Sequence, residues 1–195
     1  MNIVVATSNK KKLSQIKRIF EGHNFNIMGL ADVNIDIKEP EEDGETCYDN
    51  AVIKASYYAK LFPQYAFLAD DSGIFIKEFD NAPGVYSARW GGEHSTKACR
   101  KKLLEEMDKK NIHESKAYYQ CNMCFIYGDT QIDADGKCEG IIKNKMSSDN
   151  GLAYDPFFYV NNKAISDYSL EEKDKLNHRG KAANAMIKKI LEAGY

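Results

Sequence analysis

The spacing of apolar residues along the chain changes repeatedly between a helical and a strand-like period. Leu13, Ile16 and Phe20 recur three or four positions apart, which places them on one face of a helix. Residues 3–7, in contrast, form the short continuous apolar run that is typical of a buried strand. The same criteria predict further helices through Tyr58 after a Thr46 cap and at 96–109, 169–175 and 180–191, and further strands at 25–30, 66–69, 74–79, 117–127 and 131–142.

Strands alternate with helices early in the chain, and a hairpin is expected at residues 128–130, between the two longest strands. Loops are expected at the acidic stretch 38–45, at the turn-forming stretch 81–84 and at the polar stretch 149–156. This order predicts an α/β fold with a mixed sheet and flanking helices. We expect one domain over residues 1–195, with two lobes around a central cleft.

Composition narrows the class of protein. The chain has 195 residues, of which 43% are apolar and 29% charged, so it can bury a sizeable core and is not a disordered protein, a collagen or a coiled coil. The net charge of −2 argues against a nucleic-acid partner. No apolar run approaches the roughly 20 residues that span a bilayer, so no membrane partner is expected.

Cysteine usage and the first residues bear on the compartment. The five cysteines are odd in number, and a chain of this size does not need disulfides, so we expect them to be reduced. The chain begins directly with a strand-like run and lacks the pattern of a signal peptide. Both features favour a cytoplasmic protein.

The first candidate site lies where the strand at residues 3–7 turns into a helix. Free backbone N–H groups and the helix dipole favour an anion at such a point. Polar and basic side chains follow there in the order Thr7, Ser8, Asn9, Lys10, Lys11 and Lys12. A phosphate site is one interpretation, and a solvated helix start capped by Ser8 or Asn9 is the other. The segment is not a Walker A loop, because no G-x-x-x-x-G-K-[ST] pattern occurs in the chain.

Carboxylates form the second candidate site. Asp70 and Asp71 follow a buried apolar strand, and Glu41 and Glu42 lie in the acidic loop. Adjacent acids at a strand end are costly without a positive partner, and oxygen ligands of this kind suit Mg²⁺ together with substrate phosphates. Each pair by itself is also compatible with a plain solvated loop or a turn cap. Combined with an anion site, they predict metal-assisted phosphate chemistry.

Two further patterns are weaker. Asn177, His178 and Arg179 precede the last expected helix, where they are either an N-cap followed by exposed charges or a set of donors for a ligand. Cys121 and Cys124 are three positions apart in an expected strand, so they point to opposite faces. That spacing favours two reduced strand cysteines over a zinc or redox pair.

Taken in order, several segments resemble the inosine triphosphate pyrophosphatase family, the Ham1/RdgB-like pyrophosphatases of non-standard purine nucleoside triphosphates. The matching segments are T-S-N-K-K-K at 7–12, P-E-E-D-G-E-T at 40–46, D-N-A-V-I-K-A at 49–55, D-D-S-G at 70–73, A-P-G-V-Y-S-A-R at 82–89, G-L-A-Y-D-P at 151–156, E-K at 172–173 and H-R at 178–179. They span nearly the whole chain, and it is their shared order that is specific.

The resemblance implies an elongated α/β fold, a homodimer, and Mg²⁺-dependent hydrolysis of ITP, dITP or XTP to the monophosphate and pyrophosphate. It implies that residues 7–12 hold the triphosphate, with Lys54 adding positive charge and Ser72 contacting the substrate. Asp71 would be the general base or a metal ligand, Asp70 an alternative base, and Glu41 or Glu42 would complete the metal site. Base recognition would fall to Leu152, Ala153, Tyr154, Asp155, Lys173, His178 and Arg179.

Two departures from the family pattern concern the base. Leu152 stands where the family usually has an aromatic residue, and Asn177 stands where it usually has serine before His-Arg. If the aromatic stacks on the purine, its loss costs on the order of 1 kcal/mol. Alternatives to this function are a Maf-like pyrophosphatase for other modified nucleotides, a nucleotide sensor without catalysis, and an α/β interaction domain.

Overall fold

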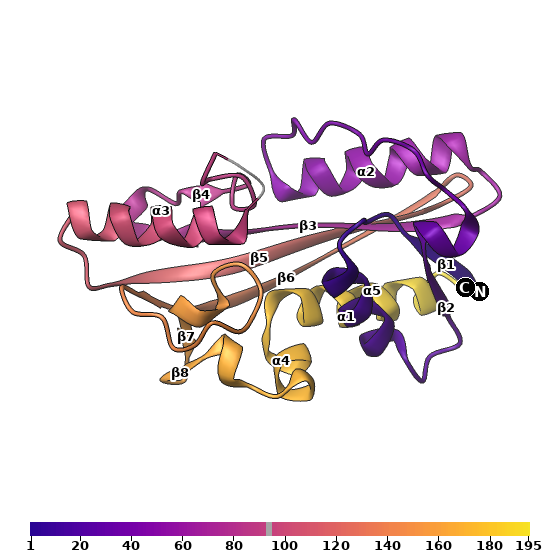
Figure 1. Ribbon diagram of the computed structural model, residues 1–195. Helices are drawn as coiled ribbons and strands as arrows, with labels where there is room; N and C mark the ends of the chain where they lie inside the picture. The colour runs from indigo at the N-terminus through magenta and orange to yellow at the C-terminus, as the bar shows by residue number, and fades with distance from the viewer. Residues whose placement is uncertain (93–94) are drawn as a thin grey trace. The chain divides into compact units, whose positions relative to one another are not determined.

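The chain folds into two compact units in the computed structural model, which describes residues 1–92 and 95–195 (Figure 1). The first unit comprises residues 1–71, 121–136 and 178–195, and the second comprises 72–120 and 137–177. The strands hydrogen-bond in the order β2-β1-β3-β5-β6-β7-β8, and β4 pairs with β3. The expected mixed α/β sheet with flanking helices is therefore confirmed.

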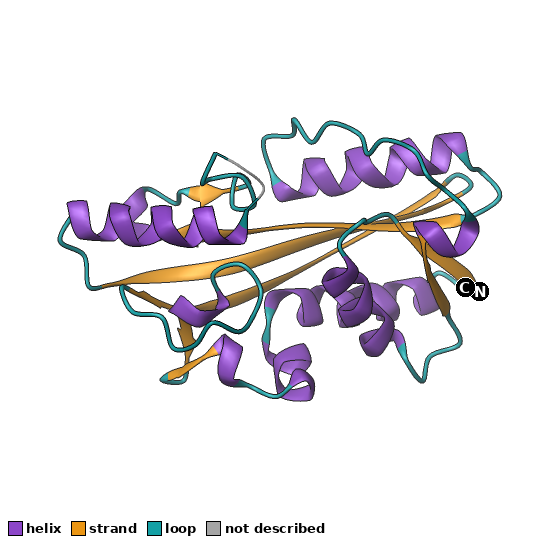
Figure 2. Cartoon of the chain, in the orientation of Figure 1, coloured by secondary structure: helices purple, strands orange, loops and turns teal. Residues whose placement is uncertain are grey.

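The first unit contains the parallel part of the sheet. Strand β1 (Asn2–Val5) pairs in parallel with β2 (Asn26–Gly29) and with β3 (Ala66–Ile76). Buried parallel strands are apolar on both faces, and β1 follows this rule. Its Ile3 and Val5 pack in one apolar cluster with helices α1 (Lys10–Phe20) and α5 (His178–Glu192), whereas Val4 packs in another with α2 (Cys47–Leu61) (Figure 2).

The second unit is built on antiparallel strands. Helix α3 (Thr96–Lys109) has the expected bounds, and its Leu103 and Met107 are fully buried in the cluster that contains Ile74 and Ile76 of β3.

The remaining elements of the whole chain are β4 (Pro83–Gly84), β5 (Glu114–Tyr127), β6 (Thr130–Lys143), β7 (Phe158–Val160), β8 (Lys163–Ala164), α4 (Leu170–Leu176), and the 3-10 turns η1 (Leu30–Val33), η2 (Lys77–Phe79), η3 (Asp155–Phe157) and η4 (Ile165–Asp167).

Three expectations about the elements were wrong. The strands expected at 66–69 and 74–79 are one strand, β3, which continues through Asp70 and Asp71, and the buried charge of Asp70 is offset by Lys12 and Arg179. The last helix begins at His178 and not at 180, so His178 and Arg179 occupy its first turn. The short strands β7 and β8 were not expected, because two or three residues leave no readable period.

Candidate functional site

The start of helix α1 is organised by its own side chains. Asn9 caps the helix, and its Oδ1 accepts hydrogen bonds from the backbone N–H groups of Lys11 at 3.0 Å and Lys12 at 3.2 Å. Thr7 Oγ1 accepts one from Asn9 N at 3.2 Å. The backbone N–H of Ser8 donates to Glu39 Oε1 at 3.0 Å, so a carboxylate already lies on this loop. The backbone N–H groups of this helix start are thus already paired within the chain, as expected for a capped helix.

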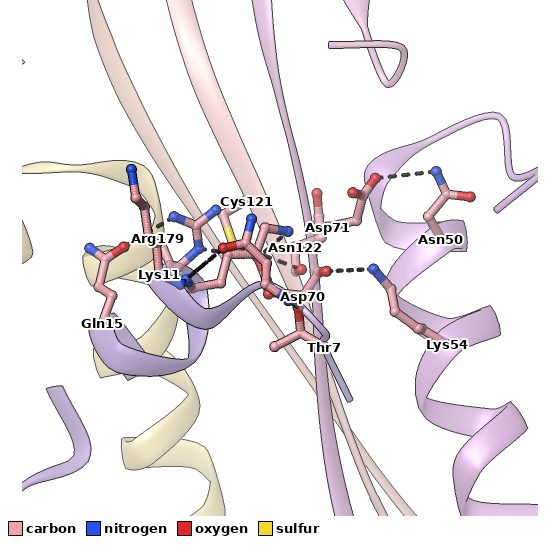
Figure 3. Close-up of polar contacts among 12 residues, drawn as sticks. Thr7, Lys11, Gln15, Asn50, Lys54, Asp70, Asp71, Cys121, Asn122 and Arg179 are labelled. Carbon is pink, nitrogen blue, oxygen red and sulfur yellow. Dashed lines mark hydrogen bonds and ion pairs between the residues drawn. The ribbon is translucent and has the colours of Figure 1, made fainter. Parts of the chain in front are cut away.

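Asp70 is the centre of the charged network in the first unit (Figure 3). Its Oδ2 atom lies 3.1 Å from Lys12 Nζ and 3.1 Å from Arg179 Nε, and its side chain is fully buried. Arg179 also donates from Nη1 to Gln15 Oε1 at 3.0 Å. Burial alone would raise the pKa of Asp70, but the charges of Lys12, Arg179 and Lys54 hold it well below its ordinary range. Asp70 therefore stays ionised and is a poor proton acceptor.

Lys54 reaches the same strand from helix α2. Its Nζ donates to the backbone oxygen of Asp70 at 3.0 Å and pairs with Glu42 Oε1 at 2.7 Å. Burial by itself would lower the pKa of Lys54, yet the carboxylates of Glu42, Asp70 and Asp71 raise it above its ordinary value. Lys54 is thus a buried, permanently charged amine. Asp70 anchors both lysines, Lys12 through its carboxylate and Lys54 through its carbonyl.

Asp71 lies on the same strand but in a different electrostatic environment. Its Oδ2 accepts a hydrogen bond from Asn50 Nδ2 at 3.2 Å (Figure 3). Burial is the main cause that raises the pKa of Asp71, and the charge of Glu42 adds to it against the opposing charges of Lys12 and Lys54. A carboxylate with a raised pKa accepts a proton more readily at neutral pH. Of the two adjacent acids, Asp71 is the one suited to act as a base.

Two carboxylates in this network are suited to a divalent cation. The charge of Glu42 raises the pKa of Asp71, and Glu42 Oε1 pairs with Lys54 Nζ at 2.7 Å. Within residues 1–92 and 95–195 no group of three His, Cys, Asp or Glu could hold a metal ion. Mg²⁺ typically uses one or two carboxylates together with water and substrate phosphates, so carboxylates here would hold it only together with a bound phosphate. Of the two loop acids, Glu42 is engaged in the network while Glu41 is exposed.

His178 is buried in the first unit, at the start of α5, and the remaining expected residues lie in the second unit. Asp155 Oδ2 accepts from the backbone N–H of Leu152 at 3.1 Å and forms a short ion pair with Lys173. Tyr154 is fully buried, and its hydroxyl donates to the backbone oxygen of Ser87 at 2.8 Å. Leu152, Ala153 and Ser72 are half-buried. The structure therefore brings Asp155 of this segment together with Lys173.

Sequence reasoning gave no role to Gln15 or Asn50, although each contacts an expected site residue. Asn50 lies within a matching segment, so its place in the motif was the available signal, whereas nothing in the local sequence marks Gln15. Cys121 and Cys124 are fully buried in two different apolar clusters, as opposite strand faces require. All five cysteines are buried and free. No helix in the described part of the chain has the length and apolar character needed to cross a membrane.

Comparison with known proteins gives a consistent result. The sequence profile of the Ham1 family matches residues 3–189. A dITP/XTP pyrophosphatase of Caldanaerobacter subterraneus is 34% identical over 98% of this chain and 97% of its own length, and one of Geobacter sulfurreducens is 39% identical over 97% and 96%. The solved structure of the Staphylococcus aureus Ham1 protein superposes with a TM-score of 0.85 at 30% identity, covering 99% of this chain and all of that one.

Proposed function

Since this chain belongs to the Ham1 family, we propose that it hydrolyses the non-standard purine nucleoside triphosphates dITP, ITP and XTP to the nucleoside monophosphate and pyrophosphate. The observation that carries the proposal is that two phosphate-compatible lysines, Lys12 and Lys54, are both fixed on Asp70, directly beside a carboxylate of raised pKa, Asp71. Two relatives that align with this chain over 97% and 96% of their own length are named dITP/XTP pyrophosphatases, and this supports the choice of substrate.

The chemistry requires an attacking water, a proton acceptor and neutralisation of the leaving pyrophosphate. Asp71 takes the proton of the water as it attacks the α-phosphorus, while Asn50 holds one of its oxygens and so fixes the carboxylate. Lys12 and Lys54 neutralise the triphosphate and the pyrophosphate that leaves, and the other side chains of residues 7–12 hold it. Asp70 keeps both lysines in place and remains ionised throughout.

We further propose that Glu42 contributes a ligand to Mg²⁺, with Glu41 as the more exposed alternative in the same loop. Asp71 would be the second ligand only if another group takes the proton of the water, because one carboxylate does not serve as base and as metal ligand at once. Bound there, the ion would supply positive charge to the phosphoryl oxygens. Carboxylate oxygens completed by substrate phosphates are the ligands that Mg²⁺ prefers, which supports this assignment.

The triphosphate assignment is tested by measuring monophosphate and pyrophosphate release from ITP, dITP, XTP, GTP, ATP and dTTP, with and without Mg²⁺. We expect strong Mg²⁺-dependent release from the first three and little from the others. A pyrimidine or ATP as the best substrate would refute the base assignment and favour a Maf-like enzyme. Binding without any release would indicate a sensor.

The role of Asp71 is tested by Asp71→Asn, which keeps the shape and the acceptor for Asn50 but removes the charge. Loss of a general base costs roughly 10²–10⁴-fold in kcat, while binding of the triphosphate is expected to persist in part. Turnover at the wild-type rate would remove Asp71 from the mechanism.

Recognition of the purine is assigned to residues 152–155 and Lys173, and the resemblance adds His178 and Arg179. Donors that match the 6-oxygen of hypoxanthine or xanthine leave the 6-amino group of adenine mismatched, and buried polar mismatches discriminate strongly. Arg179→Ala is expected to narrow the preference for ITP over ATP. Because Arg179 also holds Asp70, its loss lowers both rates, and only the ratio reports on the base. If the ratio of the rates for ITP and ATP does not change, Arg179 does not contribute to base recognition and only forms the ion pair with Asp70.

We also propose that the protein is a cytoplasmic homodimer. The free, buried cysteines support the compartment. The dimer rests on the resemblance and on an open pocket of 730 Å³ on the second unit, where Phe75, Tyr118, Ile141 and Tyr159 lie among lysine, glutamate and asparagine side chains. Apolar side chains rimmed by polar ones are typical of interaction surfaces. Light scattering is expected to give twice the chain mass for the wild type and the single mass for Ile141→Asp, and a monomeric wild type would refute the dimer.

A further inference from the structure

A single guanidinium in the second unit is bonded to three backbone carbonyls of one loop. Arg100 projects from helix α3 and donates from Nε to Ala153 O at 2.6 Å, from Nη2 to Gly151 O at 3.2 Å and from Nη1 to Asp149 O at 3.3 Å. Three different nitrogens thus reach three alternate residues. Only the planar fork of arginine can present donors in this way, because a lysine ammonium is a single point.

The loop that Arg100 holds has a backbone that does not form readily by itself. Gly151 has φ +96° and Ala153 has φ +41°, so both lie in the left-handed region. Glycine adopts that region freely, but alanine does so only at a cost in free energy. The shortest of the three hydrogen bonds is the one to Ala153 O. Arg100 therefore stabilises the strained residue directly.

Other contacts hold Leu152, Tyr154 and Asp155. Asp155 donates from its backbone N–H to Leu152 O and accepts from the backbone N–H of Leu152 at its carboxylate, and the Tyr154 hydroxyl donates to Ser87 O. The contacts of Arg100 differ, because they include the carbonyls of both left-handed residues, Gly151 and Ala153. These two residues are thus held by a side chain that lies about fifty positions away in the sequence.

We propose that Arg100 is a positioning residue for purine recognition: it pre-forms the 149–155 loop in the conformation that binds the base. The proposal rests on the assignment of residues 152–155 to base recognition. The three hydrogen bonds of Arg100 that hold this loop go to carbonyls at 149, 151 and 153. Arg100 accordingly acts on the affinity for the nucleoside end of the ligand and leaves the hydrolytic step and pyrophosphate binding unchanged.

The test compares Arg100→Met, which removes all donors but keeps a long side chain, with Arg100→Lys, which keeps the charge but not the fork. Lys97→Met is the matched control, since it removes the same charge from an exposed position of the same helix. The measurements are kcat and KM for ITP, calorimetric Kd values for IMP and for inorganic pyrophosphate, and hydrogen exchange of the backbone amides of Leu152 and Asp155.

A binding-competent fraction that falls to about one tenth raises an apparent Kd about tenfold. We therefore expect Arg100→Met to raise the KM for ITP and the Kd for IMP roughly tenfold, with kcat and the pyrophosphate Kd within about twofold. Arg100→Lys should resemble Arg100→Met, and Lys97→Met should resemble the wild type. Exchange at Leu152 and Asp155 should accelerate in both Arg100 variants.

Wild-type IMP affinity in Arg100→Met, or equal losses for IMP and pyrophosphate, would overturn the proposal. If Arg100→Met does not fold, the Kd values of Arg100→Lys for IMP and for inorganic pyrophosphate provide the same test. Failure of the proposed function is a separate result, because it would appear as a wild-type enzyme that does not release IMP from ITP. The exchange data would still report whether Arg100 holds the loop.

Discussion

Replacing Asp70 by asparagine removes the negative charge that pairs with Lys12 and Arg179 and changes the shape of the side chain very little. Lys12 Nζ and Arg179 Nε both lie 3.1 Å from the same oxygen, and the side chains of Asp70 and Arg179 are 0% and 6% exposed. Removing one partner of a buried ion pair costs about 3–5 kcal/mol, because the other charge stays buried without compensation. For a chain of this size that corresponds to a melting temperature roughly 6–20 °C lower.

The assay is urea unfolding of Asp70→Asn and wild type between pH 3 and pH 8. The folded-state pKa of Asp70 lies below its ordinary value of 3.8, so the carboxylate contributes stability that is fully present above that value and is lost as the pH falls toward the folded pKa. The difference between the two proteins is therefore expected to be constant from about pH 5 to pH 8 and to shrink below about pH 4.

Glu192→Gln is the control, since it breaks an exposed ion pair with Lys188 on the same unit and should leave the midpoint unchanged. A wild-type midpoint for Asp70→Asn would refute the reasoning, as would a difference that grows on acidification. Either result would mean that Asp70 is not the charge that Arg179 and Lys12 depend on.

Two further predictions concern packing and the thiols. Gly136→Ala should lower the free energy of unfolding by about 1–3 kcal/mol or more, because a Cβ there would lie 2.2 Å from His178 O and 2.4 Å from Ala182 N, both backbone atoms of α5; a neutral result in urea unfolding would contradict this close approach. Ellman's reagent should react slowly with the native chain and titrate all five cysteines after unfolding, since burial raises the pKa of Cys47, Cys121 and Cys124. Fewer than five thiols after unfolding without reductant would reveal a disulfide.

The sequence by itself determined most of the element order, apart from β7, β8 and the continuity of β3. The N-cap at Thr46 and the bounds of α3 follow from local capping and from a regular apolar period, which depend only on neighbouring residues. The same holds for the start of α1, because T-S-N-K-K-K carries its own cap in Asn9, which was one of the two residues expected to cap it. The expected reaction came from the family resemblance, because the matching segments occur in the same order as in the family.

Only the tertiary structure decided how the two adjacent acids differ. Asp70 and Asp71 look alike in the sequence, yet one faces Lys12 and Arg179, which lie 58 and 109 positions away along the chain, and the other faces Asn50 and Glu42. A pKa is set by burial and by charges within a few ångströms, and neither can be read from sequence distance. The same reason hid Arg100, whose three carbonyl partners are brought to it only by the fold.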